Sequence, residues 1–431
     1  IRSEQQMETA TVGAMLIEPL VGTIDADVVI PGSKSITNRA LVAAALADGV
    51  SELRGVLDAD DTQAMLGVIQ ALGAVVEPLD EADAYQITGV GGQLTPGPRE
   101  IDVRMSGTTA RFATPLAARG TGIYIIDGAP EMRARPMAET VEALRSLGVT
   151  IAPDTLPITL RGGFDGGALT LGASVSSQFA SGMLLAAPGT AKGLELDLEG
   201  DVISRPYLDM TCSVMRSFGA QVDQPSPNRF VVAPNVGYTA TSYRIEPDAS
   251  AASYFFAAAA VTGGRVKIAG LSADALQGDV GFVEILAAMG AQVTMGADYI
   301  EVQGTGSLQG IEVDMSQVSD TAQTLAAIAP FAEGPVRVTG IGFIRKKETD
   351  RVAAVVNELQ RMGIDAIEED DGFLIHPGTP QPAEIQTYHD HRMAMSFAIT
   401  GLMTRGIDIT DPDCVAKTFP TYWNVLASLT L

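Results

Sequence analysis

The sequence predicts an α/β protein built from six repeated units, three in each of two domains. The first observation is a series of glycines that follow helix-like segments at intervals of 71 to 75 residues: Gly73, Gly148, Gly219, Gly290 and Gly363. The second is a series of six glycines that end alanine-rich helical segments: Gly49, Gly120, Gly189, Gly263, Gly334 and Gly406. The third is the length, because 431 residues divided by six is about 72, close to both spacings.

Each unit contains two helices and four strands. A glycine of the first series stands where a helix needs a left-handed C-terminal residue, and a β-like run such as Ala74–Val76 follows. A strand at Ser51–Arg54 separates the two helices, and strands at Tyr85–Thr88 and Ile101–Arg104 follow the second helix. The order is therefore strand, helix, strand, helix, strand, strand. Because the chain ends before a sixth Leu-Gly, we expect the N-terminal strands within Ala14–Ile30 to complete the last unit.

Six units divide naturally into three plus three. The break then falls after the third unit, near Tyr243–Pro247, and the chain crosses back at Pro31-Gly32. We therefore expect one domain made of residues 1–32 plus 245–431 and a second domain made of residues 33–244, with a cleft between them.

The composition narrows the class of protein. Asp and Glu number 52 against 28 Lys and Arg, so the net charge of −24 disfavours binding to nucleic acid or to a membrane surface. Two cysteines exclude a disulfide framework, and the three histidines do not suggest a metal site. The apolar runs are too short to span a bilayer, and the first dozen residues lack the apolar stretch of a signal peptide. We expect a soluble protein of a reducing compartment.

Small, polar or charged residues open the first helix of every unit. The six openings are Ser33-Lys34-Ser35, Ser106-Gly107-Thr108-Thr109, Ser176-Ser177-Gln178, Asp248-Ala249-Ser250, Ser319-Asp320-Thr321 and His389-Asp390-His391-Arg392. Helix N-termini bind anions through free N–H groups and the helix dipole, although N-capping alone accounts for any single opening. His389 and His391 are two apart, so on a helix they face different directions, which argues against a zinc pair.

Cations at helix starts favour anion binding over simple N-capping as the explanation of these openings. They oppose the helix dipole, so their placement favours bound anions over helix stability. These cations are Lys34, Arg39, Arg135, Arg205, Lys347, Arg351, Arg392 and Lys417. In the densest motif, Lys347-Glu348-Thr349-Asp350-Arg351, we expect Lys347 and Arg351 to share one helix face. The pattern predicts a site for more than one phosphate or carboxylate.

Seven motifs in order resemble those of the 5-enolpyruvylshikimate-3-phosphate synthase family. They are Pro31-Gly32-Ser33-Lys34-Ser35 with Asn38-Arg39-Ala40, Ser106-Gly107-Thr108-Thr109-Ala110-Arg111, Arg135-Pro136-Met137, Ser176-Ser177-Gln178-Phe179, Lys347-Glu348-Thr349-Asp350-Arg351, Asp390-His391-Arg392-Met393-Ala394-Met395 and Ala416-Lys417-Thr418-Phe419-Pro420. The resemblance implies a two-domain inside-out α/β barrel with three βαβαββ units in each domain. It also implies transfer of the enolpyruvyl group of phosphoenolpyruvate to the 5-hydroxyl of shikimate 3-phosphate, with release of phosphate, in aromatic amino acid biosynthesis.

The resemblance also implies roles for individual residues. The catalytic residues would be Lys34, Asp320, which accepts the 5-hydroxyl proton, and Glu348, which protonates the methylene carbon. Shikimate 3-phosphate would be held by Lys34, Ser35, Arg39, Ser176, Ser177, Gln178, Ser204, Tyr207, Asp320 and Lys347. Phosphoenolpyruvate would be held by Lys34, Gly107, Arg135, Gln178, Arg351, Arg392 and Lys417. The family implies no metal and no organic cofactor, and a cytoplasmic monomer that has no nucleic-acid or membrane partner.

Two alternatives and several departures stand beside this interpretation. A sister family transfers the same group to UDP-N-acetylglucosamine and carries a cysteine before its Arg-Pro motif, but residues 128–136 have none. A non-catalytic phosphometabolite-binding protein would need neither Asp320 nor Glu348. Met105, Phe112, Glu131 and Phe343 differ from the residues common in the family, whose inhibitor is glyphosate. The sequence therefore makes no prediction of glyphosate sensitivity.

Overall fold

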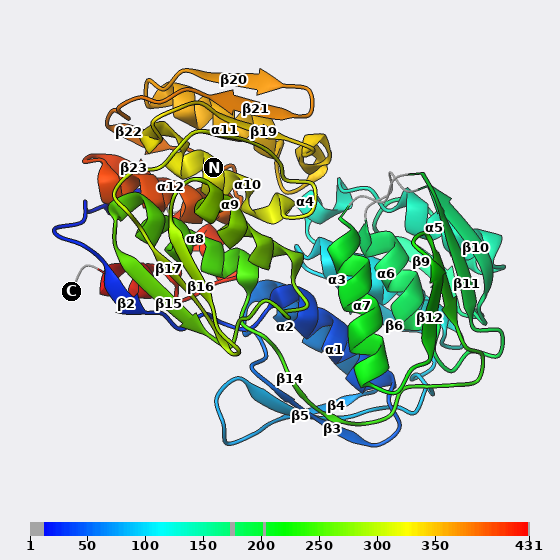
Figure 1. The fold of residues 1–431 in the computed structure, drawn as a ribbon. Coiled ribbons are helices and arrows are strands. Elements are labelled where there is room, and N and C mark those ends of the chain that lie inside the picture. The colour runs from blue at the N-terminus through cyan, green and yellow to red at the C-terminus, as the bar shows by residue number, and fades with distance from the viewer. Residues whose placement is uncertain (1–12, 173–176, 201–203, 430–431) are drawn as a thin grey trace, which may run out of the picture.

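The computed structural model describes residues 13–172, 177–200 and 204–429. Figure 1 shows two lobes, each with its sheets on the outside and its helices largely within. The described residues form six small sheets, five with four strands and one with three. This is the two-domain inside-out α/β fold that the sequence predicts.

The second unit shows how each copy is built. Its sheet has the order β6-β7-β9-β8, with β6 parallel to β7 and the other two pairs antiparallel. The elements are β6 (Arg99–Asp102), α3 (Gly107–Ala118), β7 (Ile123–Asp127), α4 (Pro130–Arg133), α5 (Ala138–Ser146), β8 (Thr150–Ala152) and β9 (Ile158–Arg161). The predicted order of strands and helices is confirmed, although β6 begins and ends two residues before the predicted strand at Ile101–Arg104.

The third and fifth units have the same order. The third comprises β10 (Gly167–Gly172), α6 (Ser177–Ala186), β11 (Leu194–Glu199), α7 (Arg205–Ser217), β12 (Val222–Ser226) and β13 (Arg229–Val232). The fifth, with short 3-10 helices labelled η, comprises β18 (Ile311–Asp314), η2 (Ser319–Thr321), α10 (Ala322–Ile328), η3 (Ala329–Phe331), β19 (Val336–Thr339), η4 (Gly342–Lys346), α11 (Arg351–Arg361), β20 (Ala366–Glu369) and β21 (Gly372–Ile375). The sheet orders β10-β11-β13-β12 and β18-β19-β21-β20 repeat that of the second unit.

The remaining units each take one strand from elsewhere in the chain. The first comprises α1 (Lys34–Leu46), β3 (Val50–Arg54), α2 (Asp60–Ala71), β4 (Val75–Pro78) and β5 (Ala84–Thr88), and β14 (Ser242–Arg244) is its outer strand. The fourth comprises α8 (Ala249–Thr262), β15 (Arg265–Ala269), η1 (Gly278–Gly281), α9 (Phe282–Ala288), β16 (Gln292–Met295) and β17 (Tyr299–Gln303), with β2 (Asp25–Asp27). The sixth comprises β22 (Ala383–Ile385), α12 (His391–Met403), β23 (Ile407–Ile409), η5 (Pro412–Lys417) and α13 (Tyr422–Ser428), with β1 (Met15–Ile17).

One expectation about the N-terminal strands is therefore wrong. Within Ala14–Ile30 only β1 completes the last unit, by pairing antiparallel with β23. β2 instead pairs parallel with β15 and supplies the first strand of the fourth unit. The reason is that every unit needs a strand before its first helix, and the fourth unit takes β2 because the strand preceding α8, β14, belongs to the first unit.

The first helix of each unit lies at the centre of its lobe. α1, α3 and α6 contact one another in one lobe, and α8, α10 and α12 contact one another in the other. All of α8 except Thr262 is buried, as expected of a helix that is apolar on every side. Small residues such as alanine let these helices approach closely, and the six N-termini belong to the openings that the sequence analysis singled out.

The predicted helix ends are also confirmed. All five glycines of the first series have positive φ, the left-handed conformation that ends a helix and that glycine adopts without strain. They are Gly73, Gly148, Gly219, Gly290 and Gly363.

The buried apolar residues form two separate cores. One contains side chains from Ile36 to Ile245, and the other contains Ile17 to Ile30 together with Ala249 to Leu429. The two chain crossings lie side by side, since Ser33 N–H donates to Glu246 O at 2.8 Å and Asp248 N–H donates to Pro31 O at 2.8 Å. From the two cores we propose domain boundaries at 32/33 and just after Ile245, one residue later than the expected 244/245, because Ile245 packs in the first of these cores.

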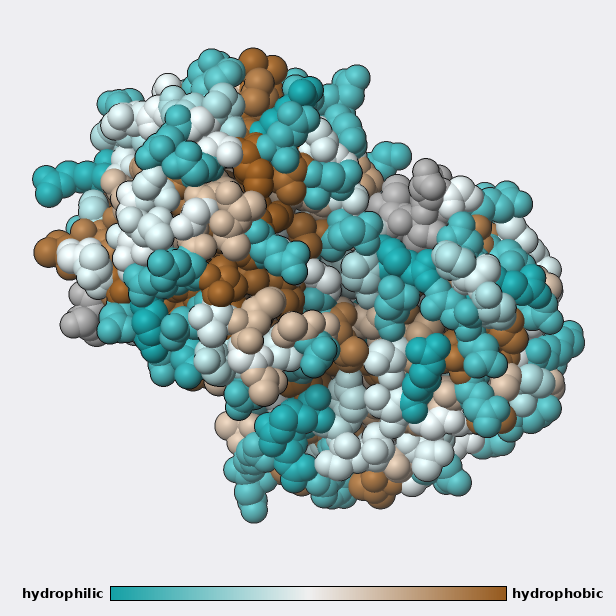
Figure 2. Space-filling view, in the orientation of Figure 1, coloured by the Kyte–Doolittle hydropathy of each residue, from teal (hydrophilic) through white to brown (hydrophobic). Residues whose placement is uncertain are grey.

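Figure 2 shows hydrophilic residues over much of the visible face of both lobes. Among the described residues, no helix is both long enough and apolar enough to cross a membrane.

Candidate active site

The N-termini of central helices from both lobes line one polar pocket. Its lining residues are Lys34, Asp61, Gly107, Thr108, Arg135, Gln178, Asp320, Lys347, Glu348, Arg351 and Arg392. Five of these are cations, and they come from both lobes: Lys34 and Arg135 from one, and Lys347, Arg351 and Arg392 from the other. The prediction of a cationic site between two domains therefore agrees with the geometry.

Arg351 lines this pocket and is only 2% exposed. Its guanidinium contacts three carboxylates: Nε lies 2.7 Å from Asp390 Oδ2, Nη1 3.2 Å from Asp320 Oδ1, and Nη2 2.9 Å from Glu348 Oε2. Asp390 is completely buried and also accepts from Arg392 N–H at 2.9 Å. Asp390 thus holds the helix opening and one guanidinium together, while Asp320 and Glu348 face the pocket.

The expectation that Lys347 and Arg351 share a helix face is wrong. α11 begins only at Arg351, because Asp350 caps it by accepting from Ala353 N–H at 3.0 Å. Lys347 and Glu348 lie in the irregular segment between η4 and α11. Both still line the pocket, since this segment runs along its wall.

Asp320 is held as a carboxylate. Arg392 Nη2 lies 2.8 Å from Asp320 Oδ2, and the Tyr207 hydroxyl donates to the same oxygen at 3.1 Å. Burial raises the pKa of the Asp320 carboxyl, but Arg392 and Lys347 outweigh burial and hold that pKa well below its usual range. Asp320 is therefore ionised, but its low pKa makes it a weak base as long as Arg392 and Lys347 face it.

Glu348 is also ionised in the absence of a ligand. Lys417 Nζ lies 3.1 Å from Glu348 Oε1, and Arg135 Nη1 lies 3.9 Å from the same oxygen. Burial raises the pKa of the Glu348 carboxyl, but Lys417 and Arg351 outweigh burial and hold that pKa well below its usual range. The two acids therefore share Arg351 and have different remaining partners.

Lys34 lies between this pocket and an adjoining one. Its Nζ lies 3.3 Å from Asp61 Oδ2, and its backbone N–H donates to Asp248 Oδ2 at 3.1 Å. Ser33 caps α1 by accepting from Ile36 N–H at 3.4 Å, which places Lys34 in the first turn. A lysine at this boundary can contact ligands in both pockets.

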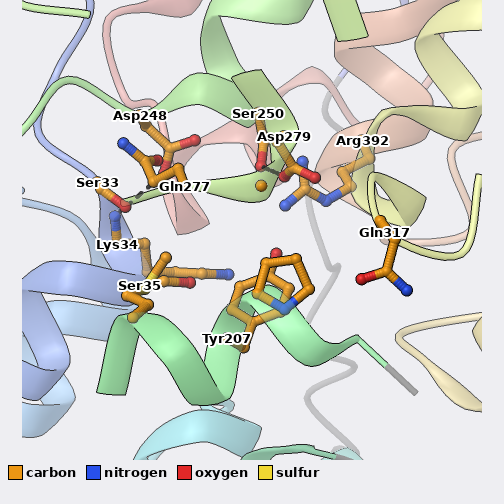
Figure 3. Close-up of a pocket in the computed structure, with 13 residues that line it drawn as sticks. Ser33, Lys34, Ser35, Tyr207, Asp248, Ser250, Gln277, Asp279, Gln317 and Arg392 are labelled. Atoms are coloured by element: carbon orange, nitrogen blue, oxygen red, sulfur yellow. Dashed lines mark hydrogen bonds between the residues drawn. The ribbon is translucent and has the colours of Figure 1, made fainter. Parts of the chain in front are cut away.

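The adjoining pocket is shown in Figure 3. It shares Lys34 and Arg392 with the first pocket and adds polar side chains that include Ser33, Ser35, Tyr207, Asp248, Ser250, Gln277, Asp279 and Gln317. Tyr207 points from α7 toward Arg392 and Asp279. Asp279 Oδ2 accepts from the Ser250 hydroxyl, whereas the buried Oδ1 has no hydrogen-bond partner among the described residues. Burial and then repulsion by Asp320 raise the pKa of the Asp279 carboxyl to about 7.

Four other predicted residues are not among the lining residues of either pocket, and one of them, Lys417, contacts the lining residue Glu348. Arg39 is buried and donates to Thr211 Oγ1 at 2.7 Å and to Ser35 O at 2.7 Å, and burial lowers its pKa to about 10. Ser177 is the buried first residue of α6, and Ser204 precedes α7 with a left-handed φ of 56°. Ser176 lies outside the described residues.

The two histidines of the last helix opening face different environments, but not for the expected reason, because α12 begins at His391 and His389 lies before the helix. The His389 side chain is largely exposed and its Nδ1 lies 2.7 Å from Asp411 Oδ2, whereas His391 is buried. Burial, with Lys34 and Arg392 nearby, holds the pKa of His391 well below its usual range, so the ring is neutral. In the part of the chain that the structure describes, no group of three or more His, Cys, Asp or Glu side chains could hold a metal ion.

The residues of this region that sequence reasoning did not assign to the site include four charged ones: Asp61, Arg111, Asp279 and Asp390. Asp61 follows Asp60 at the start of α2, where an acid is expected for helix stability alone, so its sequence gives no separate signal. Asp390 and Arg111 lie inside motifs that were singled out, and their positions in those motifs were the available signal. Asp279 lies in a 3-10 turn within a stretch that shows no feature of a site.

Comparison with known proteins agrees with this geometry. The family model described as EPSP synthase (3-phosphoshikimate 1-carboxyvinyltransferase) matches residues 20–426. A 3-phosphoshikimate 1-carboxyvinyltransferase of Nostoc sp. is 47% identical over 405 residues, covering 93% of this chain and 95% of that protein. One of Serratia proteamaculans is 41% identical over 425 residues, covering 97% of this chain and 99% of that protein.

Solved structures show the same fold. EPSP synthase from Acinetobacter baumannii has a TM-score of 0.82 and 27% identity, covering 96% of this chain and 97% of that one. The enolpyruvyl transferase NikO from Streptomyces tendae, at 18% identity and a TM-score of 0.77, covers 96% of this chain and 97% of its own, and shares the fold. With matches over nearly its full length, the chain belongs to the EPSP synthase family.

Proposed function

We propose that this protein transfers the enolpyruvyl group of phosphoenolpyruvate to the 5-hydroxyl of shikimate 3-phosphate and releases phosphate. The observation that carries the proposal is the pair of carboxylates, Asp320 and Glu348, joined by Arg351 in a pocket lined by five cations. Membership of the family supports the same activity. A pocket with this charge suits two anionic substrates and places one acid at each reacting group.

The donor occupies the side of the pocket near Glu348. Phosphoenolpyruvate carries a carboxylate and a phosphate, and the cations here fit both groups through charge-assisted hydrogen bonds. Arg351 and Arg392 bind the carboxylate. The remaining donor ligands are Lys34, the backbone of Gly107, Arg135, Gln178 and Lys417.

The acceptor occupies the side near Tyr207 and the adjoining pocket. Lys34, Ser35 and Tyr207 line that pocket and supply one cation and two hydroxyl groups. The proposed ligands of shikimate 3-phosphate are Lys34, Ser35, Arg39, Ser176, Ser177, Gln178, Ser204, Tyr207, Asp320 and Lys347. Asp320 lies where the two sites meet, since Tyr207 and Arg392 both contact it.

The reaction follows from the two acids. Asp320 accepts the proton of the 5-hydroxyl as its oxygen attacks C2 of phosphoenolpyruvate, while protonated Glu348 gives its proton to the methylene carbon. This forms a tetrahedral intermediate with a methyl group. The C–O bond to phosphate then breaks, Glu348 takes a proton back from the methyl group, and the proton held by Asp320 leaves with phosphate. Lys34 and the arginines stabilise the charge that moves onto the phosphate.

Glu348 must be protonated before it can act as an acid. In the free protein its carboxylate is paired with Lys417 and Arg351. A bound donor anion competes for the same cations, so the pKa of Glu348 rises when the donor binds. The ion pairs of the empty site therefore give way to pairs with substrate, and the acid becomes active only with the donor present.

Deuterium exchange tests the proposal. In D2O, the wild-type protein with both substrates should release phosphate and incorporate deuterium into the methylene group of the product, because the intermediate has a methyl group. Glu348→Gln should lose the exchange. Phosphate release that does not depend on shikimate 3-phosphate would overturn the proposal. We further propose that the enzyme is a cytoplasmic monomer that needs no cofactor, and sedimentation at several protein concentrations tests the oligomeric state.

A further inference from the structure

Arg111 is a buried cation that has no role in the reaction proposed above. It lies on α3, one turn after Gly107, and is 4% exposed. Its Nη1 donates to Gln178 Oε1 at 2.7 Å and its Nη2 donates to Pro136 O at 3.2 Å. Both acceptors are neutral, and the Phe179 ring lies 4.9 Å away. Burying a charged group without a carboxylate bonded to it costs free energy, so the presence of an arginine here calls for an explanation.

The first contact fixes the orientation of Gln178. Arginine can only donate hydrogen bonds, so Gln178 must present its oxygen to Arg111. Its amide nitrogen then faces the other way, where it donates to Thr108 Oγ1 at 3.2 Å. Gln178 and Thr108 both line the pocket with Glu348 and Arg351. Arg111 therefore determines which end of the Gln178 carboxamide faces its neighbours on α3.

The second contact holds the segment that carries Arg135. Pro136 follows Arg135 directly, so the bond to Pro136 O fixes the peptide next to a proposed donor ligand. Both guanidinium groups also lie against Gly107: an added Cβ there would lie 2.7 Å from Arg111 Nη1 and 2.8 Å from Arg135 Cζ. Burial and then repulsion by Arg135 lower the pKa of Arg111 to about 9. The free site thus keeps two cations together, which a bound anion would relieve.

We infer that Arg111 is a positioning residue for the donor: it orients Gln178 and holds Arg135 against Gly107, so that both meet the phosphate of phosphoenolpyruvate. This inference rests on the proposed function. Arg111 acts through these two residues and through its charge behind the phosphate.

Arg119 provides a matched control on the same helix. It follows the last residue of α3, is partly buried, and donates to the backbone oxygens of Ala186 at 2.9 Å and Pro188 at 2.6 Å. Like Arg111 it has neutral acceptors, but these lie at the end of α6 away from the pocket. Replacing it removes the same kind of contact without touching the site.

The experiment compares Arg111→Gln, Arg111→Lys and Arg119→Gln by steady-state phosphate release and thermal melting. Arg111→Gln should raise KM for phosphoenolpyruvate by about 10- to 100-fold, the effect of losing charged hydrogen bonds. KM for shikimate 3-phosphate should change by less than about threefold, because Gln178 is the one described acceptor ligand that Arg111 contacts and the other acceptor ligands are intact. Arg111→Lys should give an intermediate KM for phosphoenolpyruvate. Lysine keeps the positive charge but lacks the planar guanidinium that donates to two acceptors at once. Arg119→Gln should lower Tm and leave both KM values unchanged.

Donor KM values that are the same in Arg111→Gln and Arg119→Gln would overturn the inference. If Arg111→Gln does not fold, the folded Arg111→Lys decides: a wild-type donor KM contradicts the positioning role. Failure of the proposed function is recognised separately, because the wild type and Arg119→Gln would then release no phosphate.

Discussion

Gly107→Ala perturbs the donor site by a single methyl group. Gly107 opens α3 with no side chain, and an added Cβ would lie 2.7 Å from Arg111 Nη1 and 2.8 Å from Arg135 Cζ. Ordinary van der Waals contact begins at 3.4 Å. Both guanidinium groups must therefore move, Arg111 by about 0.7 Å and Arg135 by about 0.6 Å, to restore ordinary contact.

This displacement should weaken binding of phosphoenolpyruvate and not binding of shikimate 3-phosphate. Arg135 is a proposed ligand of phosphoenolpyruvate, and a misplacement of about 1 Å can cost up to about 100-fold in rate. We therefore expect Gly107→Ala to raise KM for phosphoenolpyruvate by about tenfold, with KM for shikimate 3-phosphate changed by less than about threefold. The assay is steady-state phosphate release in which each substrate is varied at saturating concentrations of the other.

Gly67→Ala is the matched control. Gly67 lies within α2, and an added Cβ there would meet nothing within 4 Å. Its replacement should leave both KM values unchanged and stabilise the helix by up to about 1 kcal/mol. If Gly107→Ala behaves like Gly67→Ala, or raises both KM values equally, the placement of the donor beside Gly107 is incorrect.

Further outcomes test the rest of the site and the surface. Lys34→Met should abolish phosphate release, with exposed Lys192→Met as control; turnover at the wild-type rate would contradict the role of Lys34 between the pockets. Asp390→Asn should lower the free energy of unfolding by about 3 kcal/mol in urea melts, because buried Arg351 loses a close carboxylate, and a change below about 1 kcal/mol would argue against this. The pKa of Asp279 is raised from 3.8 to about 7, so the folded state binds the extra proton between these values. The free energy of unfolding should therefore fall as pH rises across that interval, by about 1.4 kcal/mol per pH unit relative to Asp279→Asn, whereas parallel curves would disprove the shift. Raising salt from about 0.01 M to about 1 M should raise Tm, because the Debye length falls from about 30 Å to about 3 Å and screens the repulsion due to the net charge of −24; a constant Tm would contradict this.

The six-fold repeat is the feature of the fold that could be predicted most clearly from the sequence. Gly73 and the other helix-ending glycines recur at fixed spacing because each unit needs a left-handed residue at the same place. The exchange of strands between units could not be predicted, since β2 and β14 are only three residues long and resemble loops. The pairing of β2 and β14 depends on which sheet has an unpaired edge strand once the units have packed together.

The candidate site, like the fold, could be predicted from the sequence only in part. Cations at helix starts could be recognised because they oppose the helix dipole, and Lys34, Arg351 and Arg392 indeed line one pocket. Asp390 and Asp279 could not be assigned, because N-capping and turn formation account for an acid at such positions in any protein. Asp390 belongs to the site because it is buried against Arg351 of the preceding unit. Asp279 belongs to it because it is buried against Ser250 of its own unit.

The central claim is that this cleft joins phosphoenolpyruvate to shikimate 3-phosphate. The most direct measurement is the rate of phosphate release from phosphoenolpyruvate with shikimate 3-phosphate or UDP-N-acetylglucosamine as the acceptor, followed by mass spectrometry of the product. We expect release only with shikimate 3-phosphate, and a product heavier than that acceptor by the enolpyruvyl group. Phosphate release with the sugar nucleotide alone, or no phosphate release with either acceptor, would contradict the claim.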